Sequence, residues 1–226
     1  MNNIELPSYA KINLKLDIVY KRTDGYHDIR TLLQKVSLRD EVCISTSPGG
    51  IKVECDNRQV PADEDNLAYM AAHALLDQYG ITNGVTIAIK KHIPIAAGLG
   101  GGSSNAASTL IGINQLFDLG VHSQELMRLG KDIGADVPFF IFGNTALGTG
   151  IGDRLEKIEM VPTLWLLLIT PDIQISTAWA YKNVRMGLTS TPINTTIPSC
   201  INTIAEIIPL LSNDLEKVTI PRYSSL

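Results

Sequence analysis

The most informative stretch of the chain reads Pro94-Ile95-Ala96-Ala97-Gly98-Leu99-Gly100-Gly101-Gly102-Ser103-Ser104. Before it, Val85, Ile87 and Ile89 alternate with more polar residues and predict a strand. After it, an alanine-rich pattern predicts a helix over residues 105–117. Closely spaced glycines allow a tight turn that brings several N–H groups near one anion, and a following helix adds unpaired N–H groups and the positive end of its dipole. The stretch therefore predicts a phosphate-binding loop between a strand and a helix.

Two common nucleotide loops are excluded by the same residues. No Lys-Ser or Lys-Thr follows the glycines, as the Walker A motif requires. If Gly98 and Gly100 began a dinucleotide fingerprint, its third glycine would fall at Ser103. The alternative is a flexible glycine turn without a ligand, which we disfavour because glycines lose more conformational freedom on folding than other residues do. Ser103 and Ser104 add hydroxyl donors to the predicted loop.

A half-buried strand is predicted over residues 10–18, where apolar residues occupy every second position. The intervening polar residues share the opposite face: Lys11, Asn13, Lys15 and Asp17. Residues 20–25 end in Asp24-Gly25 and predict a tight turn. A lysine on the polar face of this strand is placed to face a site rather than the core.

The remaining patterns predict a mixture of strands and helices. Strands are expected at residues 41–45, 51–55, 139–142 and 164–169, and helices at residues 66–79 and 123–133 and from about Ser199 onward. The order of elements lacks regular β-α-β alternation, which favours an α+β fold over a doubly wound sheet. A boundary near residue 152 divides the chain into an N-terminal domain (residues 1–152) and a C-terminal domain (residues 153–226).

Asp136 is the best candidate for a group that accepts a proton. It lies in Gly134-Ala135-Asp136-Val137-Pro138, between a predicted helix and an apolar strand, where a carboxylate is partly desolvated. An ordinary helix-capping aspartate explains this residue about equally well. A lysine beside Asp136 would stabilise a developing alkoxide and a phosphoryl group in transfer, and Lys11 is the candidate for that role.

These motifs together resemble the GHMP kinases. The glycine-rich loop is similar to the ATP-phosphate loop of that family, residues 7–14 to its first motif, and residues 134–138 to its catalytic segment. The resemblance implies a two-domain GHMP kinase fold, an N-terminal ATP-binding domain with an incomplete C-terminal substrate domain, and ATP with Mg²⁺ as the phosphoryl donor. It also implies that Lys11 and Asp136 form the catalytic pair. It assigns no protein residue as a metal ligand.

The run Asp24-Gly25-Tyr26-His27 bears on the substrate. Adjacent Tyr26 and His27 offer a stacking face and hydrogen-bonding nitrogens for a flat heterocycle, although two aromatic residues on a hairpin are common without a ligand. The run resembles the signature of the cytidine-diphosphate-binding kinases of the methylerythritol route to isoprenoid precursors. The resemblance implies that Tyr26 stacks on cytosine and His27 hydrogen-bonds it. It further implies substrate contacts from Asn13, Thr177 and Tyr181, and a place near adenine for Asn66 and Lys91.

The composition agrees with a globular enzyme. The 226 residues are 45% hydrophobic and 19% charged, with a net charge of −4 and no long basic block, so nucleic acid is not an expected partner. Three widely spaced cysteines argue against a disulfide framework and a zinc site. The N-terminus has no continuous apolar core like that of a signal peptide, and no apolar stretch is long enough to span a bilayer. We expect a cytoplasmic protein, monomeric or weakly dimeric, without a membrane partner.

The predicted reaction transfers the γ-phosphoryl group of Mg-ATP to a hydroxyl of a small cytidine-diphosphate-linked methylerythritol. Two alternatives remain at this stage. The first is another GHMP kinase, acting on homoserine or mevalonate, which would not need the run from Asp24 to His27. The second is a nucleotide-binding remnant without turnover, because the resemblance implies a third glycine-rich motif beyond the point at which this chain stops.

Overall fold

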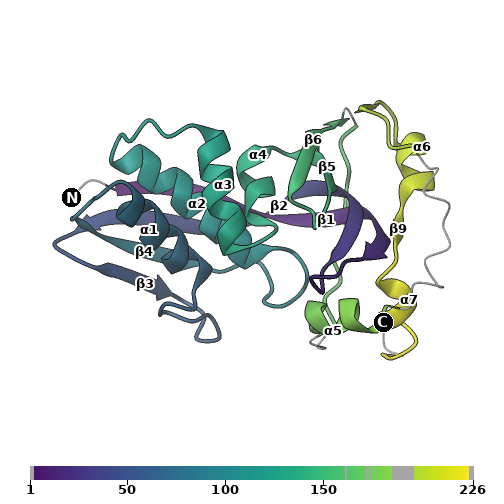
Figure 1. Ribbon diagram of the computed structural model, residues 1–226, viewed down its shortest axis with the longest axis horizontal. Coiled ribbons are helices and arrows are strands. Elements are labelled where there is room, and N and C mark those ends of the chain that lie inside the picture. Colours follow the sequence, from purple (N-terminus) through teal and green to yellow (C-terminus); the bar gives the residue numbers. More distant parts are fainter. Residues whose placement is uncertain (1–2, 161, 172, 174, 185–195, 224–226) are drawn as a thin grey trace. The chain divides into compact units, whose positions relative to one another are not determined.

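The computed structural model describes residues 3–160, 162–171, 173, 175–184 and 196–223, which form two compact units (Figure 1). Unit 1 comprises residues 1–11, 35–95 and 99–142, and unit 2 comprises residues 12–34, 96–98 and 143–226. Two long strands, β1 (Asn3–Lys21) and β2 (His27–Ser47), contribute residues to both units. The units are therefore interleaved along the chain, which differs from the linear division expected near residue 152.

Unit 1 contains a mixed sheet. Its strands lie in the order β3-β4-β2-β1, where β3 is Ile51–Cys55 and β4 is Gly84–Lys90. β4 runs antiparallel to β2, with Ile87 opposite Ile44, and parallel to β3, with Ile87 opposite Val53. All three of these side chains are buried, as the alternating pattern predicts. The strands predicted at residues 51–55 and 85–89 are confirmed, and the one at residues 41–45 is part of the longer β2.

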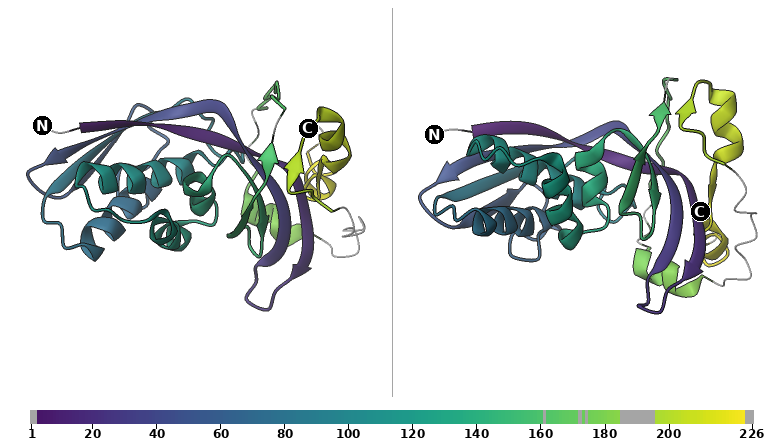
Figure 2. Two further views of the ribbon diagram at one scale, coloured as in Figure 1. Left: turned by 90° about the horizontal axis from the view of Figure 1, so that it is seen from above. Right: turned by 45° about the horizontal axis from the view of Figure 1, so that its top comes forward.

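Helices cover one side of this sheet (Figure 2). They are α1 (Leu67–Gln78), α2 (Gly101–Leu116), α3 (Ser123–Ile133) and α4 (Val137–Phe142). α2 lies close to the sheet because Gly112 has no side chain: a Cβ at that position would lie 2.5 Å from Cδ1 of Ile44. The helices predicted for α1 and α3 are confirmed, and α2 begins four residues before the predicted Asn105.

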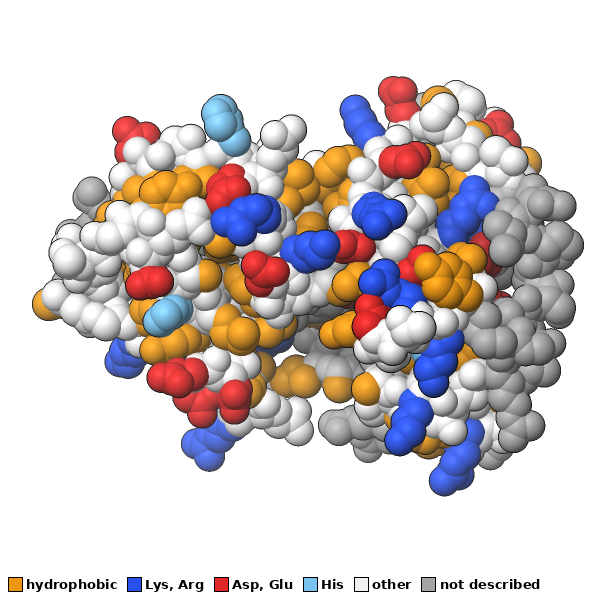
Figure 3. All heavy atoms as spheres, viewed as in Figure 1, with side chains coloured by type: hydrophobic (Ala, Val, Ile, Leu, Met, Phe, Trp, Pro, Cys, Tyr) orange, Lys and Arg blue, Asp and Glu red, His pale blue; other side chains and the backbone are white. Residues whose placement is uncertain are grey.

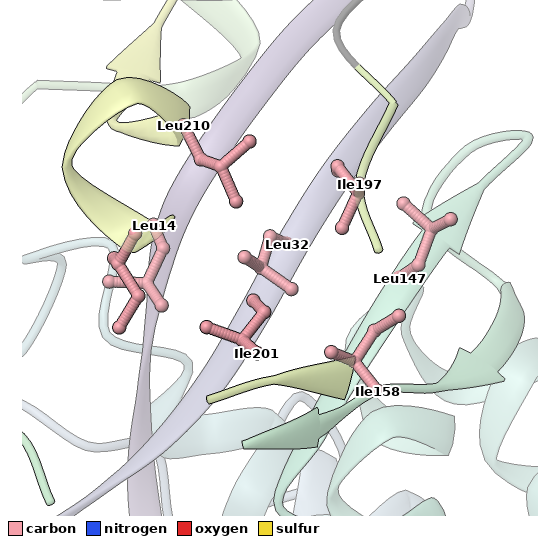
Figure 4. Packing of buried hydrophobic residues seen from close by; sticks show 8 residues of the cluster. Leu14, Leu32, Leu147, Ile158, Ile197, Ile201 and Leu210 are labelled. Atoms are coloured by element: carbon pink, nitrogen blue, oxygen red, sulfur yellow. The ribbon is translucent and has the colours of Figure 1, made fainter. Parts of the chain in front are cut away.

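Unit 2 is built around the other halves of β1 and β2. Its further elements are β5 (Thr145–Thr149), β6 (Arg154–Lys157), β7 (Glu159–Met160), α5 (Thr177–Asn183), β8 (Cys200–Ile201), α6 (Ile204–Ile207), η2 (Ile208–Leu210), β9 (Ser212–Asn213) and α7 (Glu216–Thr219). β5 pairs antiparallel with β2 and β6, β9 pairs parallel with β1, and β7 pairs parallel with β8. A buried apolar cluster joins β1, β2, β5, β8, α6 and η2 (Figure 4): Leu14, Leu32, Leu147, Ile158, Ile197, Ile201, Ile207 and Leu210.

Three predicted elements were wrong in type or extent. Residues 139–142 belong to helix α4 and not to a strand, because a short apolar run fits either element and Pro138 is readily accepted in a first helical turn. The helix expected from Ser199 begins only at Ile204, since Cys200–Ile201 pairs with β7 instead. Residues 164–169 form no strand in the described structure.

Residues 164–169 show why an apolar run does not make a strand. A strand needs a neighbour for its backbone hydrogen bonds, and none of the described strands pairs with this segment. Trp165, Leu167 and Ile169 are 95%, 85% and 78% exposed, whereas Leu164 packs against the cluster of Figure 4.

The surface of the described residues is of mixed character. On the face drawn in Figure 3, apolar patches separate charged side chains of both signs. In the described part of the chain, no helix combines the length and the apolar character needed to cross a bilayer.

Candidate active site

The glycine-rich loop ends in left-handed backbone at the start of α2. The φ angle is +72° at Gly98 and +70° at Gly100, and Gly100 is the N-cap residue of α2. Gly100 has no side chain, so among the described residues no N-cap side-chain oxygen accepts from the amide groups of the first turn. Together with the positive end of the helix dipole, these amides form a place for an anion. The predicted phosphate loop therefore has the backbone geometry that its glycines suggested.

Close approach makes glycine necessary at two positions of the loop. A Cβ at Gly100 would lie 2.9 Å from Cζ of Phe140 and 3.1 Å from Cγ of Lys11. A Cβ at Gly101 would lie 3.0 Å from Nζ of Lys91. The backbone N–H of Lys11 also donates to the carbonyl of Leu99 at 2.9 Å. β1 and the end of the loop are thus held together at Lys11.

Lys11 and Asp136 meet beside this loop, within unit 1. Nζ of Lys11 lies 3.5 Å from a carboxylate oxygen of Asp136, with the lysine side chain 9% exposed and the aspartate side chain 40% exposed. The segment before Asp136 approaches the loop as well, since a Cβ at Gly134 would lie 3.6 Å from Oγ of Ser103. The structure therefore brings together the strand lysine, the aspartate and the glycine-rich loop.

Lys35 on β2 supports the helix that follows Asp136, and sequence reasoning did not identify it. Its Nζ donates to the carbonyl of Phe140 at 2.8 Å and lies 5.9 Å from the ring centre of Phe139. Burial lowers the pKa of Lys35 to about 8. An ammonium at the last carbonyls of α4 stabilises the helix C-terminus.

The two residues expected near adenine have structural contacts of their own. Asn66 is the N-cap of α1: its side-chain oxygen accepts from the N–H of Ala68 at 2.8 Å, and its amide donates to the carbonyl of Pro61. The ammonium of Lys91 is buried against the carboxylate of Asp40. Contact of either residue with a nucleotide stays a prediction.

A second group of predicted residues lies in unit 2, at the turn between β1 and β2. The N–H of Tyr26 donates to Oδ1 of Asp24 at 3.1 Å, and Gly25 has a φ of +90°, so Asp24 and Gly25 shape the turn. Tyr26 is 61% exposed, whereas His27 is 7% exposed. The ring of His27 stacks on that of Tyr181 of α5, with centres 5.6 Å apart. Tyr181 and His27 thus form an aromatic pair, and Tyr26 presents an open ring.

The protonation of His27 follows from its surroundings. Burial lowers the pKa of His27 below its ordinary value, and the positive charge of Lys21 lowers it further. A neutral imidazole has one nitrogen that donates a hydrogen bond and one that accepts. Such a ring can pair with the mixed donors and acceptors on the edge of a heterocycle.

The other two predicted substrate residues also lie in unit 2. Nδ2 of Asn13 donates to Oγ1 of Thr31 at 2.7 Å, and Thr31 in turn donates to the carbonyl of Lys15 at 2.7 Å, which fixes the orientation of the Asn13 amide. Thr177 is exposed at the start of α5, whose N-cap oxygen is that of Ser176. Among the described residues, no group of three or more His, Cys, Asp or Glu side chains is arranged to hold a metal ion.

Comparison with known proteins gives consistent matches. A family profile described as "GHMP kinases N terminal domain" matches residues 66–144. A protein of Geobacter metallireducens named 4-diphosphocytidyl-2-C-methyl-D-erythritol kinase is 47% identical over 99% of the chain and 79% of its own length, and the protein of that name from Acetivibrio thermocellus is 44% identical over 99% of the chain and 80% of its own length.

Solved structures agree with these matches. The crystal structure of a 4-(cytidine 5'-diphospho)-2C-methyl-D-erythritol kinase has a TM-score of 0.78 and 31% identity, over 99% of this chain and 80% of that one. The homoserine kinase of Cytophaga hutchinsonii has a TM-score of 0.60 at 18% identity, over 83% of this chain and 63% of that one, which shows a shared fold alone.

Proposed function

Because the chain belongs to the 4-diphosphocytidyl-2-C-methyl-D-erythritol kinases of the GHMP family, we propose that it transfers the γ-phosphoryl group of ATP to the 2-hydroxyl of 4-diphosphocytidyl-2-C-methyl-D-erythritol. The observation that carries this proposal is the pair of Lys11 and Asp136 beside an uncapped helix N-terminus. This step belongs to the methylerythritol phosphate route to isoprenoid precursors.

Asp136 is proposed as the acceptor of the proton that the attacking hydroxyl loses. Its side chain is 40% exposed, so a substrate hydroxyl has access to the carboxylate. As the hydroxyl oxygen bonds to the γ-phosphorus, the bond from that phosphorus to the β,γ-bridging oxygen breaks and ADP leaves. The ammonium of Lys11, 3.5 Å from Asp136, stabilises negative charge on the attacking oxygen and on the phosphoryl group in transfer.

The nucleotide phosphates are proposed to bind residues 94–104. The amides at the start of α2 and the hydroxyls of Ser103 and Ser104 supply donors, and the dipole of α2 favours the negative charge. Mg²⁺ would bind chiefly to the phosphates and neutralise their charge, since this ion usually keeps several waters and few protein ligands. Asn66 and Lys91 are proposed to lie near the adenine end.

The cytidine group is proposed to bind the aromatic residues of unit 2. The exposed ring of Tyr26 provides a stacking surface, and the imidazole of His27, held by its stack on Tyr181, provides hydrogen bonds. Asn13, oriented by Thr31, and Thr177 are proposed to contact the rest of the substrate. We further propose that the protein acts in the cytoplasm as a monomer or weak dimer, which light scattering of the purified chain tests.

ADP release by the 226-residue chain tests the activity. With Mg-ATP, turnover is expected with the cytidylylated methylerythritol and not with homoserine or mevalonate. Turnover with either control in place of the cytidylylated substrate would overturn the substrate assignment. A folded chain that binds nucleotide but turns over none of the three would overturn the catalytic assignment.

The variant Asp136→Asn tests the mechanism. Loss of the proton acceptor is expected to lower kcat by about 10²- to 10⁴-fold, with nucleotide affinity unchanged. Asp132→Asn is the matched control, because Asp132 lies four residues earlier and is exposed on α3. The control is expected to keep kcat within about twofold of the wild type. Wild-type kcat in Asp136→Asn would contradict the assigned role.

A further inference from the structure

A buried polar cluster lies in unit 1 next to the phosphate loop, and the proposed chemistry does not use its central residue. That residue is Asp40 of β2, whose side chain is fully buried. Around it lie Ser8, Ser104 and Asn105, all at most 3% exposed, and Lys91, whose side chain is 6% exposed. A buried carboxylate is costly unless several donors satisfy it, so its partners indicate what it does.

Asp40 binds both the segment that enters the loop and the helix that leaves it. Its Oδ1 accepts from the backbone N–H groups of His92 and Ile93, each at 2.8 Å, immediately before the loop. Its Oδ2 accepts from Nδ2 of Asn105 at 2.9 Å, in the second turn of α2, and from the ammonium of Lys91. One carboxylate therefore links the two ends of residues 94–104.

The same carboxylate sets the direction of a chain of hydrogen bonds. Because a carboxylate accepts, the amide nitrogen of Asn105 must face Asp40, and its oxygen then faces Lys91 at 3.4 Å. Nδ2 of Asn105 also donates to Oγ of Ser8 at 2.8 Å. Oγ of Ser8, in turn, donates to Oγ of Ser104 at 2.9 Å. Within the cluster, Oγ of Ser104 accepts a hydrogen bond. The hydroxyl hydrogen of Ser104 is therefore available to donate to another acceptor.

We propose that Asp40 is a positioning residue of the phosphate loop. It holds the two ends of the loop in one arrangement and, through Asn105 and Ser8, presents Ser104 as a hydrogen-bond donor to the nucleotide phosphates. The inference rests on the proposed function, because it assumes that the loop binds the phosphates of ATP. Lys91 contributes to the same arrangement: its ammonium balances the buried carboxylate, and a Cβ at Gly101, at the start of α2, would lie 3.0 Å from its Nζ.

Two ligands separate positioning of the loop from a general effect on the fold. The non-hydrolysable imido analogue of ATP, with Mg²⁺, carries the phosphates that the loop is proposed to bind. Adenosine has no phosphates and so cannot make these contacts. In Asp40→Asn, the side-chain NH₂ group would face donors from which the carboxylate now accepts hydrogen bonds, so these bonds would be lost. The variant is expected to bind the ATP analogue about tenfold or more weakly in calorimetry, with a distinctly smaller loss of adenosine affinity.

Ser8→Ala provides a second variant that leaves the Asp40–Lys91 pair intact. It removes one link of the chain and is expected to weaken the ATP analogue selectively as well, by about threefold to tenfold. If Asp40→Asn does not fold, Ser8→Ala decides the question. The matched control is Asp214→Asn, since Asp214 is 5% exposed and accepts from the N–H of Ile18 at 2.8 Å and from Nζ of Lys217 at 2.7 Å, among residues of unit 2. That control is expected to lower stability and to leave the ratio of the two affinities unchanged.

The outcomes distinguish this inference from the proposed function. A wild-type chain that does not bind the ATP analogue would overturn the proposed function, and the inference with it. A wild-type chain that binds it, with Ser8→Ala and any folded Asp40→Asn binding it equally well, would overturn the inference alone. An equal loss of affinity for both ligands would show that Asp40 only stabilises the fold, and this result would also overturn the inference.

Discussion

Replacing Gly100 with alanine tests the contact between the phosphate loop and Lys11. Gly100 has a φ of +70°, and an added methyl group would lie 2.9 Å from Phe140 and 3.1 Å from Lys11. The left-handed backbone costs an alanine about 1–2 kcal/mol, and overpacking against these side chains adds about 1–3 kcal/mol. We expect Gly100→Ala to lose about 2–5 kcal/mol of unfolding free energy. Because the methyl displaces Lys11 from its place beside Asp136, we also expect kcat to fall by about tenfold or more.

Gly120→Ala is the matched control for backbone strain. Gly120 has a φ of +64°, and an added methyl group would meet nothing within 4 Å. Its cost should be the backbone term alone, about 1–2 kcal/mol, without an effect on kcat. Urea unfolding and ADP release on both variants measure the difference. Equal stability loss in the two variants, with wild-type kcat in Gly100→Ala, would refute the close packing of the loop on Lys11.

Two further predictions concern His27 and Ala96. Since burial lowers the pKa of His27, the unfolded chain binds a proton that the folded chain resists, so stability should fall as pH drops below about 6.5 toward the lowered value. Urea unfolding across this range should show a weaker pH dependence in His27→Phe, and an identical dependence would contradict the assignment. Ala96 is a non-glycine residue with a φ of +56°, so Ala96→Gly should gain up to about 1 kcal/mol. Ala97→Gly, at a neighbouring residue without positive φ, should lose stability instead, and the same loss in Ala96→Gly would argue against strain at residue 96.

The backbone of the glycine-rich loop was predictable because its signal is local. Glycine spacing and a following helix pattern determine the backbone that Gly98 and Gly100 adopt, and no distant residue is needed to recognise it. The pairing of Lys11 with Asp136 is different, because 125 positions separate these residues in the sequence. The pattern placed each residue on a suitable element, but only the resemblance to a family joined them, and the structure places them 3.5 Å apart.

The errors in the fold arose where tertiary surroundings decide the local structure. Residues 139–142 are apolar without a clear period, so either a helix or a strand could bury them. Residues 164–169 have the composition of a buried strand, but a strand exists only where a neighbour accepts its hydrogen bonds. Composition predicts burial in both cases, which is confirmed for Phe139 and Phe140 but wrong for most of residues 164–169, and the type of element depends on what lies beside it.

Asp40 was not predicted, although the sequence contains a signal for it. In a strand, every second residue shares a face, so Asp40 lies on the same side as the buried Val42 and Ile44. By the same period Ser8 precedes the buried Ala10, and Lys91 follows the buried Ile89. Ser8 and Asp40 thus continue the buried side of an apolar alternation within β1 and β2, and Lys91 does so one residue after the end of β4.

A single polar residue at a position where the alternation predicts an apolar one commonly marks only the end of the buried part of a strand. Buried polar groups, however, require hydrogen-bond partners, and a buried lysine and a buried aspartate are stable only as a pair. Three such interruptions, next to strands that the structure places in one sheet, therefore indicate a shared polar cluster. In the structure Asp40 and Lys91 pair directly, and Asn105 joins Asp40 to Ser8. All of these residues flank the phosphate loop, where an apolar core could stabilise the fold but could not orient a hydroxyl group toward an anion.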